Sequence, residues 1–416
     1  MKFKILMCVT VITFLAALAL PTQCLAQKNT KKLPHYTVVD LGTLGGTFTA
    51  AGGMSNTGWV EGWASLPNGN LNAFLWHDGV MTDLGTLGGP NSDSGWPPND
   101  SGDAAGGAET GAVDPYAENY CAYNDNLLCL AFFWRSSTRK MTALPTLGGN
   151  NGYGAGVNDW DVVAGNAENT TPEPACAGTT QYFQFEPVLW INGRVKQLPT
   201  FPGDPDGAAN GINDWGQAIG WSGNCFNPVH ALLWQNGKVT NLGNLGGTQS
   251  EAIVINNVGQ VTGYSNLPSD QYYDAFLWTG GKMLDLGTLP GDVSSAGYYL
   301  NDWGQVVGVS NDASGNSRAF IWQNGVMTDL NIIMPPNSQF YLLAGMAIND
   351  EGQIALMALQ TSSGAIHALL ATPSHGEATT TAATERPKVT VPENVRKLLQ
   401  RRTHFGANRV GPGVPQ

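Results

Sequence analysis

The sequence predicts an all-β protein: a seven-bladed β-propeller built from four-stranded antiparallel blades. Three observations predict this fold. One sequence unit recurs along most of the chain, each copy contains four short strand-like stretches separated by turn residues, and the stretch missing from the last copy stands in front of the first. Self-similarity at a fixed period is the sequence signature of repeat folds.

The clearest copy of the unit runs from Leu286 to Asp329. Its residues 296–300, 305–310, 319–322 and 326–330 are apolar or β-branched runs, and we label them strands a, b, c and d. Strand b (QVVGVS) is almost continuously apolar, which is typical of a strand buried on both faces.

Turn residues separate these strands. Asn301-Asp302-Trp303-Gly304 lies between strands a and b, where Asn and Asp accept local hydrogen bonds and Gly supplies a positive φ. Asn324-Gly325 lies between strands c and d, and Asn-Gly between two apolar runs indicates a tight hairpin. One copy is therefore a four-stranded antiparallel meander.

Seven copies follow one another. The linker into strand a, LGTLGG or a variant, begins at Leu41, Leu84, Leu144, Leu198, Leu242, Leu286 and, in degraded form, Leu330. The a–b turn begins at Ser55, Asn99, Asn158, Asn213, Asn256, Asn301 and Asn349. Strand c ends in Trp76, Trp134, Trp190, Trp234, Trp278 and Trp322, and in Ala371 in the last copy.

The two ends of the repeat array complement each other. Residues 35–41 (HYTVVDL) read like a d strand but precede any a, b or c strand, whereas the last copy stops after its c strand at 366–371. A ring in which the N-terminal strand completes the last blade explains both, and closure removes exposed sheet edges. An open solenoid, the alternative, leaves both features unexplained. We assign residues 35–374 to the propeller.

The N-terminus has the order of a secretory signal peptide. Lys2 and Lys4 precede an apolar run from Ile5 to Leu20, and a small-residue cleavage site follows at Ala26. The apolar run is too short for a transmembrane anchor. We therefore expect residues 1–26 to be removed, residues 27–34 to form a short linker, and the mature protein to be secreted, periplasmic or extracellular.

Residues 375–416 differ in composition from the repeats. Their first part is rich in Thr and Ala, which predicts disorder, and residues 392–402 are compatible with a short amphipathic helix. This tail carries seven Lys and Arg against three Asp and Glu, whereas Lys28 to Ser374 carries 11 against 29, a net charge of −18. An acidic ring argues against nucleic acid as a partner.

Loop length marks one face of the ring. In a blade, the d–a linkers and b–c loops lie on one face, and the a–b and c–d turns lie on the other. Length variation concentrates in two b–c loops, Glu109–Leu128 and Ala167–Phe185, and long loops on a rigid scaffold usually carry binding. The candidate ligand-binding residues on this face are Glu109, Asp114, Glu118, Asp125, Glu168 and Glu173. The alternative is that these loops are surface decoration.

All four cysteines after the signal peptide lie near these loops. An even number of cysteines in an exported protein predicts disulfides, and we favour Cys121–Cys129 and Cys176–Cys225 among the three connectivities. We expect no cofactor. Calcium is the alternative, with Asp204 and Asp206 as candidate ligands, although no twelve-residue calcium loop is present.

Tryptophans recur at two positions of the repeat. Those that end the c strands occupy equivalent positions in successive blades, which predicts packing between blades rather than a sugar-binding set. Trp160, Trp215 and Trp303 instead lie in a–b turns. These three are the better candidates for exposure.

No catalytic motif is present. The chain contains no Gly-x-Ser-x-Gly elbow, phosphate loop or His-Glu-x-x-His pattern, and His230 and His367 occupy the same repeat position. We therefore predict a binding or interaction module for carbohydrate, a cell-envelope component or a protein. The alternative is a propeller enzyme that acts on extracellular carbohydrate through loop or channel carboxylates.

The repeated A-F-[LI]-W…NG…[MV]-T-D-L-G-T-L-G-G with N-D-W-G-Q-V-V-G resembles the HAF family of extracellular repeats, named for a His-Ala-Phe tripeptide, over nearly all of Tyr36 to Ala371. The resemblance implies an exported β-repeat protein and implies no activity or catalytic residues. Only His230 and His367 keep the family's His; Asn72, Leu130, Glu186, Asp274 and Arg318 replace it. These replacements indicate a structural role for that position. The repeats lack the signatures of WD, kelch and sialidase blades.

Overall fold

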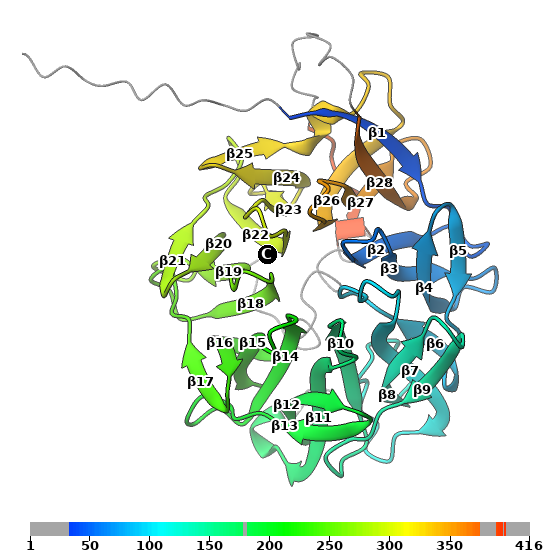
Figure 1. Ribbon diagram of the computed structural model, residues 1–416, viewed down its shortest axis with the longest axis vertical. Coiled ribbons are helices and arrows are strands. Elements are labelled where there is room, and N and C mark those ends of the chain that lie inside the picture. The colour runs from blue at the N-terminus through cyan, green and yellow to red at the C-terminus, as the bar shows by residue number, and fades with distance from the viewer. Residues whose placement is uncertain (1–32, 178–180, 375–387, 394, 397–416) are drawn as a thin grey trace, which may run out of the picture. The chain divides into compact units, whose positions relative to one another are not determined.

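The computed structural model describes residues 33–177, 181–374, 388–393, 395 and 396. The predicted signal peptide and most of the predicted linker and tail lie outside the described residues. From Pro34 on, the described chain forms a closed ring of sheets around a central axis (Figure 1). Within the part of the chain that the structure describes, no helix is long and apolar enough to cross a membrane.

The described residues form seven four-stranded antiparallel sheets, so the predicted β-propeller is confirmed. The innermost a strands are β2 (Thr49–Met54), β6 (Gly88–Asp93), β10 (Gly152–Val157), β14 (Asp206–Ile212), β18 (Ser250–Ile255), β22 (Ser294–Leu300) and β26 (Phe340–Ile348). The b strands are β3 (Val60–Ser65), β7 (Ala104–Val113), β11 (Val163–Pro172), β15 (Ala218–Asn224), β19 (Val261–Asn266), β23 (Val306–Asn311) and β27 (Ile354–Gln360).

The two outer strands of each blade complete the sheets. The c strands are β4 (Leu71–His77), β8 (Leu127–Arg135), β12 (Phe183–Ile191), β16 (Asn227–Gln235), β20 (Tyr273–Thr279), β24 (Ser317–Gln323) and β28 (Ile366–Ser374). The d strands are β5 (Val80–Asp83), β9 (Lys140–Ala143), β13 (Arg194–Gln197), β17 (Lys238–Asn241), β21 (Lys282–Asp285), β25 (Val326–Asp329) and, from the N-terminus, β1 (His35–Asp40). Two 3₁₀ turns, η1 (Pro174–Cys176) and η2 (Leu330–Ile333), interrupt the connections.

The composite last blade is also confirmed. Strand β1 pairs antiparallel with β28 from His35 opposite Ser374 to Asp40 opposite Leu369, in sheet order β1-β28-β27-β26. Tyr36 and Leu41 are buried by this pairing. The two ends of the propeller are therefore held together by main-chain hydrogen bonds.

A repeated glycine in strand b explains how closely the inner two strands pack. Strand a has a β-bulge opposite this glycine. In blade 5, for example, the pairing register of β18 with β19 shifts between Ala252 and Val254. A Cβ on Gly263 would lie 1.9 Å from the carbonyl oxygen of Glu251, and one on Gly308 would lie 2.0 Å from that of Ala296. Glycine at this strand b position is therefore required by steric contact in these blades.

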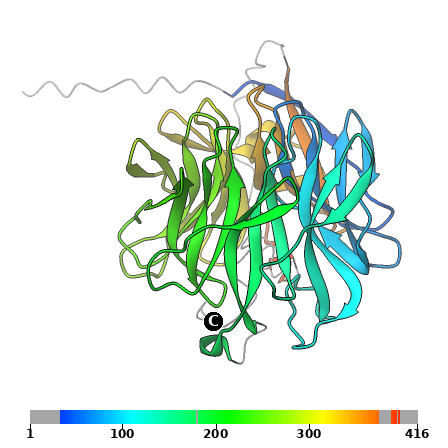
Figure 2. The same ribbon diagram turned by 60° about the horizontal axis from the view of Figure 1, so that its bottom comes forward.

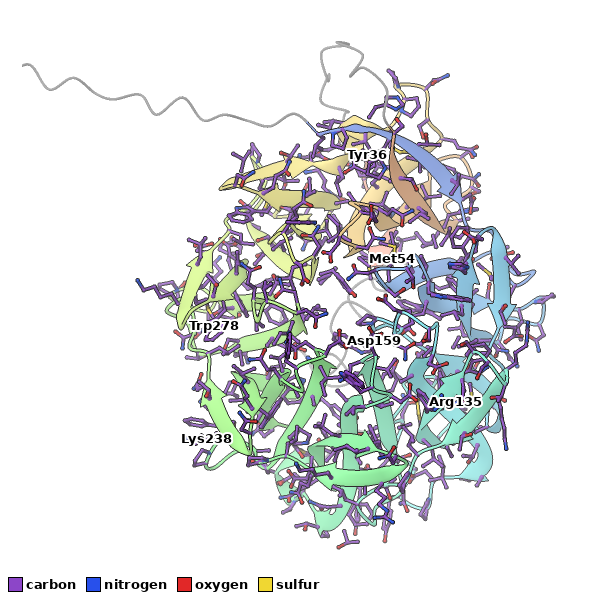
Figure 3. The ribbon with its side chains drawn as sticks, in the orientation of Figure 1. Tyr36, Met54, Arg135, Asp159, Lys238 and Trp278 are labelled. Carbon is purple, nitrogen blue, oxygen red and sulfur yellow. A yellow bond between two sulfur atoms is a disulfide. The ribbon has the colours of Figure 1, made fainter. Side chains whose placement is uncertain are left out.

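The c-strand tryptophans pack in the interior, as predicted. Trp190 and Trp234 are buried, and their indole N–H groups donate to the carbonyls of Pro145 and Pro199 in the linker that enters the same blade. Trp278 is half-buried and lies within the wall of the ring (Figure 3). These side chains hold the blades and linkers together and do not form a ligand platform.

The residue before the Ala-Phe of strand c pairs across to strand d. Asn72 donates to Asp83 (2.8 Å), Arg318 forms a salt bridge with Asp329 (3.2 Å), and His367 lies 2.8 Å from Asp40. Different polar pairs thus occupy one structural position. This agrees with a structural role for the position that holds His in HAF repeats.

Loss of β1 should open the ring. We expect a variant lacking residues 35–41 to lose hydrogen bonds worth about 1 kcal/mol each and burial worth roughly 2 kcal/mol for each of Tyr36 and Leu41. Thermal melting should therefore fall by many degrees relative to a control lacking only residues 27–32. Equal melting of the two variants would contradict the closure described above.

Candidate functional site

The loop face, formed by the d–a linkers and b–c loops, does not present the predicted carboxylates to solvent. Glu109, Asp114, Glu118 and Glu168 are each at most 2% exposed, and Glu173 is 9% exposed. Asp125 alone of the six is exposed. Five of the six candidate residues are therefore buried, because the long loops fold back over their own acids. Their role in ligand binding stays a prediction.

The buried acids join neighbouring blades. The amide of Asn151 donates to Asp114 (2.9 Å) and lies within hydrogen-bonding reach of Glu118 (3.4 Å) and Glu168 (3.2 Å). Glu118 also accepts from the backbone N–H groups of Tyr182 and Phe183. These contacts tie the long loop of blade 2 to that of blade 3.

Burial shifts the protonation of this cluster. Desolvation and the neighbouring Glu118 raise the pKa of Glu168 to about 9, and desolvation also raises the pKa of Glu118. The pKa of Glu109, which bonds to Asn91, rises to about 8, again mainly through burial. Because the cluster is closed to solvent and occupied by protein donors, it gives no support to the enzyme alternative.

The remaining predicted site residues also serve structural roles. Glu173 accepts from the N–H of Ala175 at the start of η1 and from Gln184. Asp204 accepts from Ser222 and lies 2.8 Å from His230. Within the described part of the chain, no group of three or more His, Cys, Asp and Glu is arranged to hold a metal. The calcium alternative therefore gains no support.

Two disulfides complete the loop-face structure, with the predicted pairing. Cys121–Cys129 closes the blade 2 loop, and Cys176–Cys225 links blade 3 to blade 4. Asp206 reinforces the second link by accepting from the N–H groups of Cys225 and Phe185. Disulfides of this kind indicate an oxidising compartment. We call residues 109–128, 167–177, 181–185 and 223–228 the cap; Figure 2 shows its loops extending beyond the strands.

The channel beneath the cap is narrow. Tyr120, Phe185 and Phe226 pack on one another, with the rings of Phe185 and Phe226 stacked at 4.4 Å. The cavities along the channel have volumes of about 30 and 40 Å³, enough for a few water molecules. These two cavities therefore have room for water molecules but not for a sugar ring.

The opposite face, which we call the turn face, carries the a–b and c–d turns. The second residue of each a–b turn points its Oδ1 at a backbone N–H of the preceding blade: Asn56, Asp100, Asp159, Asp214, Asn257, Asp302 and Asp350. The seven hydrogen bonds, 2.8 to 3.1 Å long, form a closed circle. Figure 3 shows Asp159 on the inner side of the ring.

The first residue of the turn adds a second set of links. Asn213 accepts from the N–H groups of Trp215 and Gln217 in its own turn and donates from its amide to the carbonyl of Asn256 in the next blade (3.0 Å). Asn158 and Asn301 make the same contact with their neighbours. The repeated Asn-Asp pair is therefore a blade-to-blade joint, a role that a single copy of the motif does not reveal.

The third residue of the turn is the exposed one. Trp160, Trp215 and Trp303 are 73%, 76% and 74% exposed, and Val258 holds the same position in blade 5 at 62%. Each indole N–H nevertheless donates to a carbonyl of the next blade, at 2.9 to 3.0 Å. The expected exposure of these tryptophans is confirmed, and their rings are held in fixed positions. We call the three tryptophans, together with Val258 at the equivalent position, the aromatic arc.

The aromatic arc borders an acidic mouth of the channel. The mouth encloses about 110 Å³ and is lined by the second-position residues, five of them aspartates, and by no Lys or Arg. Burial and the neighbouring aspartates raise the pKa of Asp159 and of Asp302. This mouth is polar, larger than the cavities along the channel, and flanked by exposed indole rings. It is therefore a better candidate binding site than the loop face. Reading the turn motif as seven equivalent positions, rather than loop length alone, would have indicated it.

Comparisons with known proteins give only distant likenesses. The sequence matches no protein-family model and no curated protein. A puromycin-hydrolyzing peptidase from Mycobacterium tuberculosis is 11% identical with a TM-score of 0.44, over 80% of this chain and 55% of the peptidase. TolB from Acinetobacter baumannii is 14% identical with a TM-score of 0.38, over 73% of this chain and 76% of TolB. This chain thus spans about half the length of the peptidase.

The circle of turn hydrogen bonds can be tested at one link. Asp302→Ala removes the acceptor for the N–H of Asn257, and we expect the free energy of unfolding to fall by about 1 kcal/mol. Asp302→Asn keeps an Oδ1 and should change stability by less than about 0.5 kcal/mol, because Asn already occupies this position in two blades. Chemical denaturation measures both. Equal losses of unfolding free energy in the two variants would show that this hydrogen bond does not account for the stabilising effect of Asp302.

The buried acids predict an unusual pH dependence. The raised pKa values are about 9 for Glu168, 8 for Glu109, 7 for Glu251 and Asp274, and 6 for Asp206. A carboxyl whose pKa is raised by folding keeps its proton longer in the folded state, so its stability contribution is complete below the unfolded pKa and is lost as pH rises through the folded pKa. Stability should therefore fall from about pH 4 to pH 9.

Glu168→Gln isolates one group of this set. Gln keeps an acceptor for the N–H groups of Asn150 and Asn151 and has no proton to lose, so the melting temperature should fall less between pH 5 and pH 9 than in the wild type. Glu351→Gln, at an exposed carboxyl of blade 7, is the matched control. Stability that rises over this range, or a Glu168→Gln profile identical to the wild type, would contradict the prediction.

Proposed function

We propose that this chain is an exported, non-catalytic binding module, and that its ligand is a carbohydrate polymer without acidic groups that lies across the turn face. The aromatic arc is the observation that supports this proposal most. Exposed apolar patches on a soluble protein commonly mark interaction sites, and three tryptophans on one face are each about three-quarters exposed.

The chemistry of the arc fits a sugar. The apolar face of a sugar ring stacks on an indole, and each indole is fixed by its N–H bond to the next blade, so little side-chain entropy is lost on binding. The Asp and Asn side chains of the mouth offer hydrogen-bond partners to hydroxyl groups. The five aspartates would repel an anionic polymer.

Export is part of the same proposal. The two disulfides, the predicted signal sequence and the resemblance to HAF repeats support it. Membership of the HAF family remains a prediction.

Co-sedimentation of the mature protein with insoluble chitin, chitosan and cellulose tests the ligand class, with alginate beads as the anionic control and isolated cell envelope as a further target. We expect retention on at least one uncharged or basic polymer, none on alginate, and no released sugar in the supernatant. Sugar release would overturn the proposal in favour of the enzyme alternative. Retention on envelope alone would point to a protein or envelope ligand.

The arc itself is tested by substitution. Trp160→Ala, Trp215→Ala and Trp303→Ala combined should weaken binding at least tenfold, about 1.4 kcal/mol. The three Trp→Phe changes keep a ring but lose the N–H bond, and should keep most of the binding. Tyr272→Ala, at an exposed aromatic of the loop face, is the control. Undiminished binding by the triple alanine variant would place the site elsewhere.

A further inference from the structure

Residues 388–393, 395 and 396, which we call the strap, lie on the loop face against blades 6 and 7. Composition predicts disorder for the first part of the tail and a short helix over residues 392–402, and a main-chain hydrogen bond from Arg396 to Pro392 is compatible with that helix. All seven blades are complete at Ser374, and the described strap residues join no sheet. In Figure 1 the end of the strap, in red, is seen beside the inner strands β2 and β26.

Two buried valines anchor the strap in the core of the propeller. Val391 and Val395 are 0% and 2% exposed and belong to the main apolar core, with Val389 packed beside them. The N–H of Val391 donates to Asn316 (3.0 Å). The N–H of Arg396 donates to the carbonyl of Pro392 (2.9 Å), which closes one helical turn. The strap thus fits its site as an extended peptide with a helical end.

Two cations flank the valines. The ammonium of Lys388 lies 2.8 Å from Asp292 and 4.0 Å from Asp312. The guanidinium of Arg396 donates to the carbonyl of Ser314 at 2.6 Å. Asp292, whose side chain is 0% exposed, also pairs with Arg318 at 2.8 Å. The groove therefore complements the strap in both charge and shape. The ring that contains it carries a strongly negative net charge.

We propose that this groove is a peptide-binding site: the linker 289–293 and the loop 312–316 of blade 6, with Tyr341 of blade 7, accept an extended segment of the pattern Lys-Val-x-Val-Pro-x-x-Val-Arg. The strap fills the groove in the folded chain. A basic, valine-bearing peptide in trans is the ligand class that the groove takes when the strap leaves it. Tethering gives the strap an effective concentration far above that of most free peptides, so exchange requires that the strap be weakened.

The test uses the full chain with the strap unseated. Val391→Asp places a carboxylate in a fully buried apolar position, which strongly disfavours docking, without changing a residue of the ring. A fluorescent peptide of residues 386–398 should then bind the Val391→Asp chain saturably, and bind the wild-type chain at least tenfold more weakly. The same peptide carrying Val391→Asp or Lys388→Glu should not bind. Polysaccharide co-sedimentation should be unchanged, because the turn face is untouched.

Hydrogen exchange supplies a readout independent of the peptide. In the wild-type chain the amides of Val391 and Arg396 should be protected, and in the Val391→Asp chain they should exchange freely while the ring amides keep their protection. Rapid exchange of both amides in the wild type would overturn the docking itself. Equal peptide binding by the two chains, or none by the Val391→Asp chain with an intact ring, would overturn the peptide site.

Discussion

The structure depends on the joint between neighbouring blades at the a–b turns. Each blade is a small sheet that cannot bury both of its faces alone, and its position relative to the next is fixed by side chains that bond to main chain. The Oδ1 of Asp214 holds the N–H of Asp159, and the amide of Asn213 holds the carbonyl of Asn256. Because these bonds return through Asn56 to Asp350, the circle constrains the number of blades as well as their spacing.

The same joint produces the candidate site. In most blades, the first two residues of the a–b turn form hydrogen bonds to a neighbouring blade. The third residue points outward, and in three blades it is tryptophan. The N–H of Trp215 joins the circle by donating to Asn257, while its ring faces solvent. An exposed aromatic normally costs rotamer entropy on binding, but here the fold has already fixed it. The same indole therefore supplies both the stabilising N–H bond and the exposed ring of the proposed binding surface.

The fold could be predicted well from the sequence because the same strand and turn pattern recurs seven times along the chain. Closure by residues 35–41 and the exposure of Trp303 followed from position in the repeat, and the disulfide pairs followed from the even number of cysteines near the long loops. The candidate residues of the loop face were predicted from loop length, which does not reveal whether a loop folds inward and buries its acids. Glu168 and Asn151 are 17 positions apart, and only the packed cap shows that one amide bonds to three carboxyls.

The two faces of the ring consequently have different chemistry. On the loop face, most of the candidate carboxyls are buried, and burial raises the pKa of Glu109, Glu118 and Glu168. Disulfides join the cap, and the strap covers part of blades 6 and 7. On the turn face, Asp159 and its equivalents remain around a mouth of about 110 Å³ beside the aromatic arc. The two cavities described along the channel have room for a few water molecules, whereas the rings of the arc lie exposed on the turn face. The proposed ligand is therefore one that would contact several rings of the arc at once.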